Sequence, residues 1–345
     1  MKNRILLSVL LLLACSFMLF AGGGAQQQSQ GGGSSTGPVY PNTVLRWGTT
    51  SVEGTVVVDT MRDFARRVAD ATGGNVRVEI FPASQLGSAI ELIRNTQMGA
   101  LDMTMSQPAM LGDLGIGEMP ILVLPYVFSS FDQRWNVLSG SIGNELLQKI
   151  TDGRVQLRGF GYFLDGARSF FTVEGKPIRR FEDVRGMKLR VQATELDNDM
   201  AIALGASPTP TSSAEMYPAL QSKIVDGVEQ PIAAYYSGKF YEVSKYFTLD
   251  EHYYNTLVIV FSEISWNRLN EDTRKVLNDC WKQSFDASKA EIVSNEQETL
   301  KMIAAEGVEV ITLPDIEKWA NAMQPLYAKY AANYMDLVSR IQNTR

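Results

Sequence analysis

The feature that most constrains this fold is a long helical pattern from Asn270 to Glu306 that contains neither proline nor glycine. A helix rises 1.5 Å per residue, so this one would be about 55 Å long. A small domain is only about 30 Å across. We therefore expect this helix to cross between two lobes and to brace them.

Strand and helix patterns alternate along the rest of the chain, in two blocks. The first block predicts strands at 44–48, 75–81, 100–106 and 155–163, and helices at 56–72, 88–98 and 132–150. The second predicts strands at 168–173, 187–191, 223–228 and 257–262, and helices at 195–204, 212–222 and 232–242. A strand at 308–313 and a helical region at 315–341 follow. This alternation indicates an α/β fold, and two blocks indicate a cleft between lobes, where ligands commonly bind.

The first 42 residues read as an export leader and a spacer. A short basic segment is followed by an apolar run that ends at Ala21, and then by a tract of Gly, Gln and Ser. This order is typical of a secretory signal peptide. We expect a signal peptide at 1–21, cleaved after Ala21 or Ala25, a flexible spacer at 22–42, and a periplasmic mature protein.

A second interpretation of the leader stays open. Leu12-Leu13-Ala14-Cys15 resembles a bacterial lipobox, in which Cys15 would carry a lipid anchor. The segment after Cys15 is very apolar for a mature N-terminus, which favours ordinary cleavage. Either route places the body of the chain outside the cytoplasmic membrane.

Composition and motifs exclude several classes of function. The net charge is −6, which argues against a protein that works on nucleic acid. With one histidine and two cysteines, the chain cannot build a zinc ribbon or a disulfide framework. The hydrolase, nucleotide-binding and zinc-protease motifs are all missing. We therefore expect no enzyme, no cofactor and no metal site, and we interpret His252 as a structural hydrogen bonder.

Two arginines stand out against this background. Arg190 lies in Lys188-Leu189-Arg190-Val191, inside a short apolar strand, and Arg168 follows a Gly166-Ala167 turn. A buried arginine is costly unless its charge is paired. One interpretation is an internal ion pair. The other is that both arginines hold the carboxylate of a ligand, which suits the planar fork of a guanidinium.

Several motifs in order resemble one transport family. They are Gly186-Met-Lys-Leu-Arg-Val191, Leu204-Gly-Ala-Ser-Pro-Thr-Pro210, Glu215-Met-Tyr-Pro-Ala-Leu-Gln221, Val225-Asp-Gly-Val-Glu229, Phe81-Pro-x-Ser-Gln-Leu-Gly87, Gly99-Ala-Leu-Asp-Met103, Leu124-Pro-Tyr126 and Phe240-Tyr-Glu-Val-x-Lys-Tyr246, followed by His252. Together they cover nearly the whole body from Val44 onward. The chain thereby resembles the substrate-binding subunit of tripartite ATP-independent periplasmic (TRAP) transporters, of the dicarboxylate-binding type.

This resemblance implies a monomeric extracytoplasmic solute receptor with a two-lobed, type II-like periplasmic-binding-protein fold. The receptor would close around a small organic acid and deliver it to a small and a large membrane permease subunit. We expect lobe I to comprise 43–165 and about 256–295, and lobe II to comprise 166–255 and about 296–345. The identity of the acid stays open.

The resemblance also implies the binding residues. Arg190 matches the family's principal carboxylate-binding arginine, and Arg168 matches a second arginine of sialic-acid-binding members. Gln230 stands where those members use an asparagine, and Ser213 where many members place an aromatic ring. Thr50 and Gln107 fall at cleft positions of the other lobe. The departures at Gln230, Ser213 and Thr50 argue against sialic acid as the ligand.

Because Ser213 removes the usual aromatic ring, another residue would have to form that wall. Four candidates fit the pattern, and core packing explains them equally well: Tyr162, Phe163, Tyr235 and Tyr236. Tyr236 is the one we expect to line the ligand site.

Two other functions stay open. The chain could be the solute receptor of a different import or sensing system, although these motifs fit that less well. It could also be an exported enzyme that uses carboxylates such as Glu229 and Asp165 as acid and base. The missing catalytic motifs count against the enzyme.

Overall fold

The computed structural model describes residues 37–345. The expected signal peptide at 1–21, Cys15 and most of the spacer lie outside the described residues. Residues 1–38 and 39–345 form separate units, and the description below concerns the second. In the part of the chain that is described, no helix combines the length and the apolar character needed to cross a membrane.

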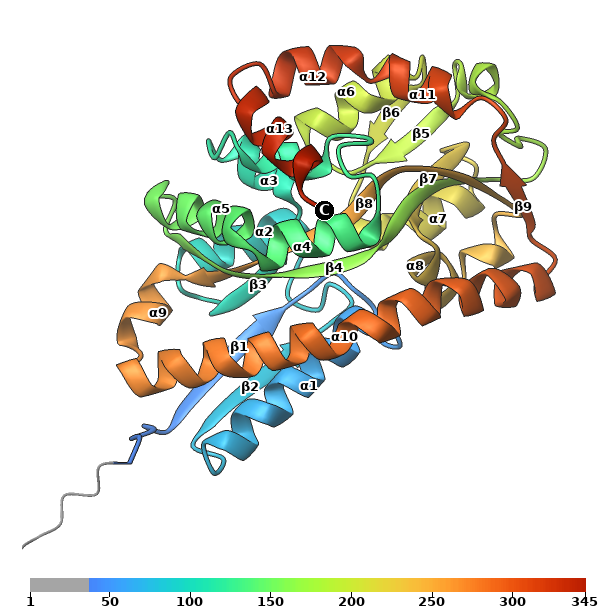
Figure 1. The fold of residues 1–345 in the computed structure, drawn as a ribbon. Helices are drawn as coiled ribbons and strands as arrows, with labels where there is room; N and C mark the ends of the chain where they lie inside the picture. Colours follow the sequence, from blue (N-terminus) through green and yellow to red (C-terminus); the bar gives the residue numbers. More distant parts are fainter. Residues whose placement is uncertain (1–36) are drawn as a thin grey trace, which may run out of the picture. The chain divides into compact units, whose positions relative to one another are not determined.

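The body is built on one mixed sheet (Figure 1). Its strands follow the order β2-β1-β3-β8-β4-β7-β5-β6, and β9 pairs with β8. Their bounds are β1 Thr43–Gly48, β2 Val76–Phe81, β3 Met103–Ser106, β4 Leu157–Thr172, β5 Lys188–Val191, β6 Ser207–Pro210, β7 Gly227–Pro231, β8 Tyr246–Ser262 and β9 Glu309–Thr312. Strands β1 to β3 form one end of the sheet and β5 to β7 the other, so two α/β lobes share a central pair of strands.

Strands β4 and β8 are the connection between the lobes. The sequence predicts separate strands at 155–163 and 168–173, whereas β4 is continuous over 16 residues, and β8 over 17. The two pair antiparallel, with a shift of register between Leu164 and Ala167. The expected Gly166-Ala167 turn is therefore wrong, because both residues lie within β4 at this irregularity. Such a bulge bends the strand where it passes from one lobe to the other.

Most helices confirm the expected ranges. The helices before the long one are α1 Val56–Ala71, α2 Ala89–Gln97, α3 Pro108–Asp113, α4 Phe131–Ser139, α5 Ser141–Asp152, α6 Glu195–Ala203, α7 Met216–Gln221, α8 Ile232–Ser237 and α9 Glu263–Arg268. Ser88 and Glu91 form a capping box at the start of α2. The single helix expected at 132–150 is two helices, because the chain is extended at Gly140.

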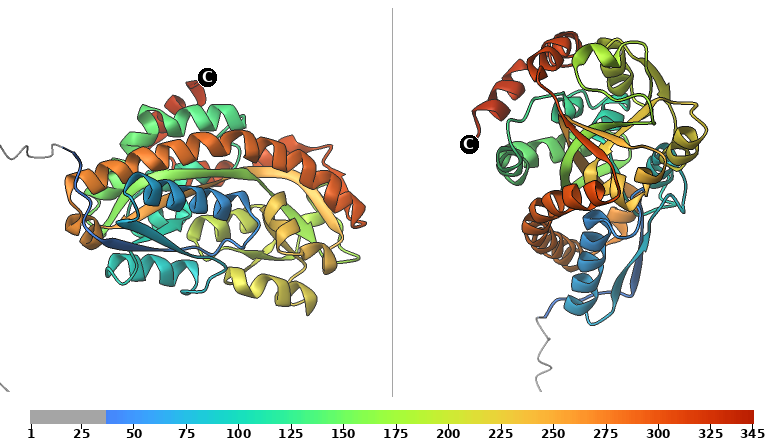
Figure 2. Two further views of the ribbon diagram at one scale, coloured as in Figure 1. Left: turned by 90° about the horizontal axis from the view of Figure 1, so that it is seen from below. Right: turned by 90° about the vertical axis from the view of Figure 1, so that its right-hand side faces the viewer.

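Helix α10, Glu271–Ala305, confirms the long helix and its span across both lobes. Its N-cap Asn270 accepts a hydrogen bond from the backbone N–H of Thr273 at 2.9 Å. It packs first against α1 and later against α8 and β9 (Figure 2). Trp281 and Phe285 anchor its first half in the core, where Phe285 stacks on Trp135 at 4.2 Å. One rigid rod thus contacts both lobes.

The helical region expected at 315–341 is three short helices: α11 Ile316–Ala322, α12 Gln324–Tyr330 and α13 Met335–Asn343. The side-chain amide of Gln133, on α4, donates to the carbonyl oxygens of Ile341, Gln342 and Thr344 at 3.1 to 3.3 Å. Arg340 pairs with Glu145, on α5, at 2.6 Å. These bonds hold the C-terminal helix against α4 and α5. The lobe boundaries given above stay a prediction.

Candidate functional site

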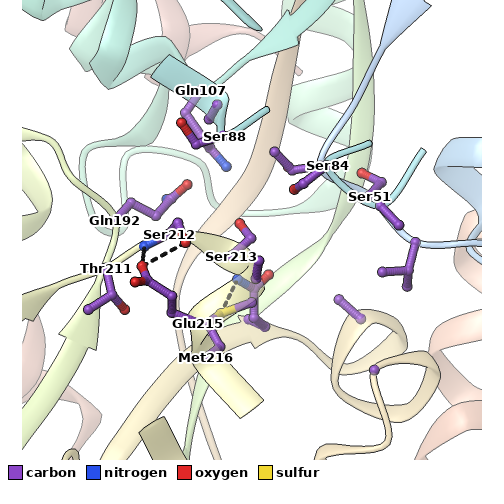
Figure 3. Close-up of a pocket in the computed structure, with 18 of the residues that line it drawn as sticks. Ser51, Ser84, Ser88, Gln107, Gln192, Thr211, Ser212, Ser213, Glu215 and Met216 are labelled. Carbon is purple, nitrogen blue, oxygen red and sulfur yellow. Dashed lines mark hydrogen bonds between the residues drawn. The ribbon is translucent and has the colours of Figure 1, made fainter. Parts of the chain in front are cut away.

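A cavity of about 510 Å³ is lined by both ends of the sheet. One side comes from the loop after β1, the start of α2 and the end of β3, and the other from β5, the segment 210–217, β7 and Phe240. Six of the seven expected binding residues line it, namely Thr50, Gln107, Arg168, Arg190, Ser213 and Gln230. Figure 3 shows several of these walls facing one another.

The structure does not place Tyr236, the seventh residue, among those that line the cavity. Tyr236 is half-buried and stacks on Tyr241, with ring centroids 5.5 Å apart. Tyr162, Phe163 and Tyr235 also lie outside the lining and are packed in the hydrophobic cores. The aromatic rings that do line the cavity are those of Tyr217 and Phe240.

Arg190 brings a buried charge to this cavity, and no carboxylate of residues 37–345 forms an ion pair with it. Its side chain is only 2% exposed. Its Nε and Nη2 donate to the backbone carbonyl of Thr211 at 3.1 and 2.6 Å, while Nη1 has no partner among the described residues. Burial lowers the pKa of Arg190 to about 10, so the group stays charged at neutral pH. Its remaining N–H groups are available to an anion.

Arg168 differs from Arg190 because its charge is already compensated. It forms an ion pair with Glu229, and its Nη2 donates to the carbonyl oxygen of Glu229 at 2.9 Å. Burial alone would raise the pKa of Glu229, but the charge of Arg168 lowers it to about 2. The internal ion pair considered for both arginines therefore occurs at Arg168.

His252 extends this buried network away from the cavity. Its Nδ1 lies 2.5 Å from Oδ2 of Asp250, and its Nε2 lies 3.8 Å from Oε2 of Glu229. Burial lowers the pKa of His252, but the two carboxylates more than reverse this and raise it to about 9. The ring stacks on Phe170 at 4.9 Å and does not line the cavity. These contacts agree with the expected structural role.

Asn255 is a lining residue that the sequence analysis missed. It lies on β8 beside the register shift, and its Oδ1 accepts from Arg168 Nη1 at 3.1 Å and from Gln107 Nε2 at 2.6 Å. Its Nδ2 donates to Oδ2 of Asp165 at 3.1 Å. The one signal in the sequence is an amide side chain inside an otherwise apolar and aromatic strand. Asn255 links the two sides of the cavity through a single amide.

Asn255 is itself fixed from behind by Arg134, on α4. The guanidinium of Arg134 donates to the carbonyl oxygens of Asn255 and Asp165 at 3.0 and 2.5 Å. It lies over the rings of Phe131 and Tyr254, at 5.2 and 4.8 Å from their centroids. These two carbonyl groups are at the irregular point of the β4–β8 pairing, so Arg134 stabilises the backbone where the strands bend.

Both sides of the cavity are rich in hydroxyl groups. Figure 3 shows these serine and threonine side chains: Ser51, Ser84 and Ser88 on one side, and Thr211, Ser212 and Ser213 on the other. Glu215 also lines the cavity, and its Oε2 accepts from the backbone N–H and the hydroxyl of Ser212 at 2.9 and 2.7 Å. These two bonds lower the pKa of Glu215. The surface can therefore bind an anion at one point and polar groups elsewhere.

The acid–base pair considered for an enzyme is not arranged for catalysis. Glu229 is held by Arg168, and Asp165 is half-buried and accepts from Asn255. Burial raises the pKa of Asp165. Within residues 37–345, no cluster of three or more His, Cys, Asp or Glu side chains could hold a metal ion.

The fold and the cavity together define a two-lobed solute-binding protein. The family model of bacterial extracellular solute-binding proteins, family 7, matches residues 47–333, and the chain belongs to this family. This is a family of transport receptors and not of enzymes. This match and the relatives and solved structures described next confirm the TRAP resemblance and the two-lobed α/β fold.

Two curated relatives are informative. The chain is 30% identical over 295 residues to the sialic acid-binding periplasmic protein SiaP of Vibrio cholerae, covering 84% of this chain and 89% of the relative. It is 31% identical over 272 residues to the C4-dicarboxylate-binding protein DctB of Bacillus subtilis, covering 77% and 76% of the two chains.

Solved structures show the same fold. A TRAP periplasmic solute-binding protein of Bradyrhizobium sp. BTAi1, in complex with D-galacturonate, is 32% identical with a TM-score of 0.83, covering 87% of this chain and 99% of that one. A protein of the same type from Sulfurospirillum deleyianum, with bound succinate, is 26% identical with a TM-score of 0.82, covering 88% and 100%. The two ligands are a sugar acid and a dicarboxylate.

Proposed function

We propose that this protein is the receptor of a TRAP transporter and binds a small organic acid in the cavity between its lobes. The observation that carries the proposal is Arg190, a buried guanidinium that lines the cavity and whose Nη1 has no hydrogen-bond partner among the described residues. A carboxylate would supply both the missing charge and the missing acceptor. The galacturonate and succinate bound by similar structures support this assignment.

In this proposal, Arg190 holds the ligand carboxylate, and Arg168 supports it from its ion pair with Glu229. Gln230 and Ser213 contact the ligand from the same lobe, and Thr50 and Gln107 contact it from the other. The two lobes comprise 43–165 with about 256–295, and 166–255 with about 296–345. Tyr236 has no direct role, because it stacks on Tyr241 away from the lining.

Native mass spectrometry of the protein purified from its own host tests the binding step. We expect a mass increment that matches an organic acid, and the released compound should bind again to the stripped protein in a calorimetric titration. The same titration of Arg190→Ala tests the role of this arginine. Its matched control is Arg77→Ala, which removes a positive charge from an exposed position on β2. A released ligand without a carboxylate would refute the proposal.

The delivery step involves a small and a large membrane permease subunit and needs no ATP. We expect uptake of the acid into proteoliposomes that contain both subunits only when the receptor and a sodium gradient are present. Uptake without the receptor, or uptake that depends on ATP, would contradict this step. The receptor acts as a monomer, which size-exclusion chromatography with light scattering can check.

The mature protein lies in the periplasm, as its family does, after cleavage following Ala21 or Ala25. Lipidation at Cys15 is the alternative. The intact mass of the exported protein separates the two routes, because a lipid-modified N-terminal cysteine adds the mass of its acyl chains and retains residues 15–21.

A further inference from the structure

The hydrogen bonds around Asn255 fix the orientation of a second amide, that of Gln107. A guanidinium only donates and an ionised carboxylate only accepts. The Asn255 atom that faces Arg168 at 3.1 Å must therefore be the oxygen, and the atom that faces Asp165 must be the nitrogen. Because the oxygen of Asn255 accepts, the Gln107 atom 2.6 Å away from it must be Nε2. The oxygen of Gln107 is the atom left over.

This oxygen has no donor in the described part of the chain. Gln107 lines the cavity and is 7% exposed, and its Oε1 is buried without a hydrogen-bond partner. A buried acceptor that stays unpaired is costly. A ligand that fills the cavity must therefore offer a donor to Gln107, whereas it must offer an acceptor to Nη1 of Arg190.

The charges of the lining exclude a second ligand carboxylate. The cationic side chains that line the cavity, among residues 37–345, are Arg168 and Arg190. Arg168 is compensated by Glu229, so a single positive charge stays available. The lining also contains the carboxylates of Asp165 and Glu215. A second carboxylate on the ligand would lose its hydration without gaining a cation, which is unfavourable.

We propose that the ligand is a hydroxylated monocarboxylic acid and that Gln107 is the residue that selects it. The carboxylate binds Arg190, and a ligand hydroxyl donates to Oε1 of Gln107. The serine and threonine hydroxyls on both sides of the cavity accept from and donate to the other hydroxyls of the ligand (Figure 3). This inference rests on the proposed function, since it specifies the acid that the receptor binds.

A matched set of ligands tests the inference in calorimetric titrations of the wild-type protein. The four-carbon set is D-erythronate, butyrate, succinate and 4-aminobutyrate, and the six-carbon set is D-gluconate, hexanoate, adipate and 6-aminohexanoate. Within each set the carbon number is constant, while the hydroxyls, a second carboxylate or an ammonium group change. We expect the hydroxy acid of at least one set to bind about 10- to 100-fold more tightly than the plain and the dicarboxylic acid of that set, because the plain acid leaves Gln107 unpaired and the dicarboxylic acid brings a second carboxylate without a cation. An ammonium group also donates to Oε1 of Gln107, so the amino acid of each set tests whether the donor is a hydroxyl.

The variant Gln107→Met tests whether Oε1 of Gln107 causes the preference for the hydroxy acid. We expect it to reduce the affinity ratio between the hydroxy acid and the plain monocarboxylate to within a few-fold. A merely structural role would weaken both ligands equally and leave the ratio unchanged, which would overturn the role of Gln107. The control is Gln97→Met, which removes an amide that donates to the carbonyl of Val155 at 2.9 Å, outside the cavity. This control should keep the wild-type ratio.

A second variant keeps the test decisive if Gln107→Met does not fold. Gln107→Glu retains an acceptor oxygen and removes the Nε2 donor, so we expect weaker binding overall but a preserved preference for the hydroxy acid. Loss of that preference in Gln107→Glu would contradict the assignment.

The outcomes separate this inference from the proposed function. If succinate, adipate or an amino acid binds as tightly as the hydroxy acid of its set, the inference is wrong and the receptor for an organic acid stands. If none of the eight acids binds, the inference is wrong as well. If, in addition, the ligand released from the native protein has no carboxylate, the proposed function falls too.

Discussion

Replacing Arg190 tests how the cavity recognises an anion. In Arg190→Ala, a bound carboxylate loses two N–H groups and a full charge at a site that is 2% exposed. Removing one member of a buried, hydrogen-bonded charge pair costs about 2–5 kcal/mol. At about 1.4 kcal/mol per tenfold change, this corresponds to roughly 30- to several-thousand-fold weaker binding. Arg190→Lys should recover little, because an ammonium group cannot form the two parallel bonds of a guanidinium.

The structure also predicts what Arg190→Ala does to the free protein. The charge of Arg190 has no ion-pair partner in the described residues, and its contacts are two hydrogen bonds to the carbonyl of Thr211. Removing it leaves no carboxylate without a partner and abolishes the cost of burying a lone cation. We therefore expect a folded variant whose Tm lies within a few degrees of the wild type.

Calorimetric titration with the released ligand, together with thermal unfolding in its absence, separates the outcomes. Arg77→Ala should behave as the wild type in both measurements. If Arg190→Ala binds the ligand within a few-fold of the wild type, or if it unfolds, then Arg190 is a structural residue and the reasoning about the cavity is wrong.

Three further predictions concern the Arg168–Glu229 ion pair, the pKa of His252 and the closure of the lobes. Arg168→Ala leaves the buried carboxylate of Glu229 without its partner at a cost of about 3–5 kcal/mol, so thermal unfolding should show a Tm lower by roughly 5–10 °C; an unchanged Tm would contradict the ion pair. The pKa of His252 is raised from 6.5 to about 9, so its stabilising contribution is complete below pH 6.5 and is lost as the pH rises through 9. The Tm of the wild type should accordingly fall more steeply over this range than that of His252→Gln, and parallel curves would refute the shift. Ligand binding should close the lobes about the bend in β4 and β8, and small-angle scattering that shows no smaller radius of gyration at saturation would exclude this.

The fold could be predicted from the sequence because its signals are periodic and local. The helix from Glu271 to Ala305 contains no residue that could end it, and its length alone required two lobes. The capping box at Ser88 fixed the start of α2. The continuity of β4 could not be predicted, because the local pattern indicates a turn at Gly166-Ala167 and only pairing with a distant strand, β8, keeps this segment extended.

The sequence predicts the charged residue of the candidate site, because burying an unpaired charge is unfavourable. It does not predict which aromatic side chains line the cavity, because an aromatic ring fits a core as well as a binding site. Arg190 was identified because a cation within an apolar strand is unfavourable unless an anion pairs with it. Tyr235 and Tyr236 are neighbours on α8, and either could face the cavity or the core. Tyr235 is buried with its hydroxyl donating to the carbonyl of Ser244 at 2.7 Å, and Tyr236 stacks on Tyr241. Only the tertiary structure brings Ser244 and Tyr241 next to these two tyrosines, so the local sequence pattern does not predict the contacts.

Asn255 shows why the rest of the site required coordinates. Its single amide accepts from Arg168 and Gln107 and donates to Asp165. These three residues are between 87 and 148 positions away in the sequence, on β4 and at the end of β3. None of these pairs has a local spacing that a sequence motif could encode. The orientation of the Gln107 amide, and with it the kind of ligand group that can bind there, depends on all three bonds at once. The specificity of the cavity is therefore a property of the assembled strands β3, β4 and β8, and no single motif contains it.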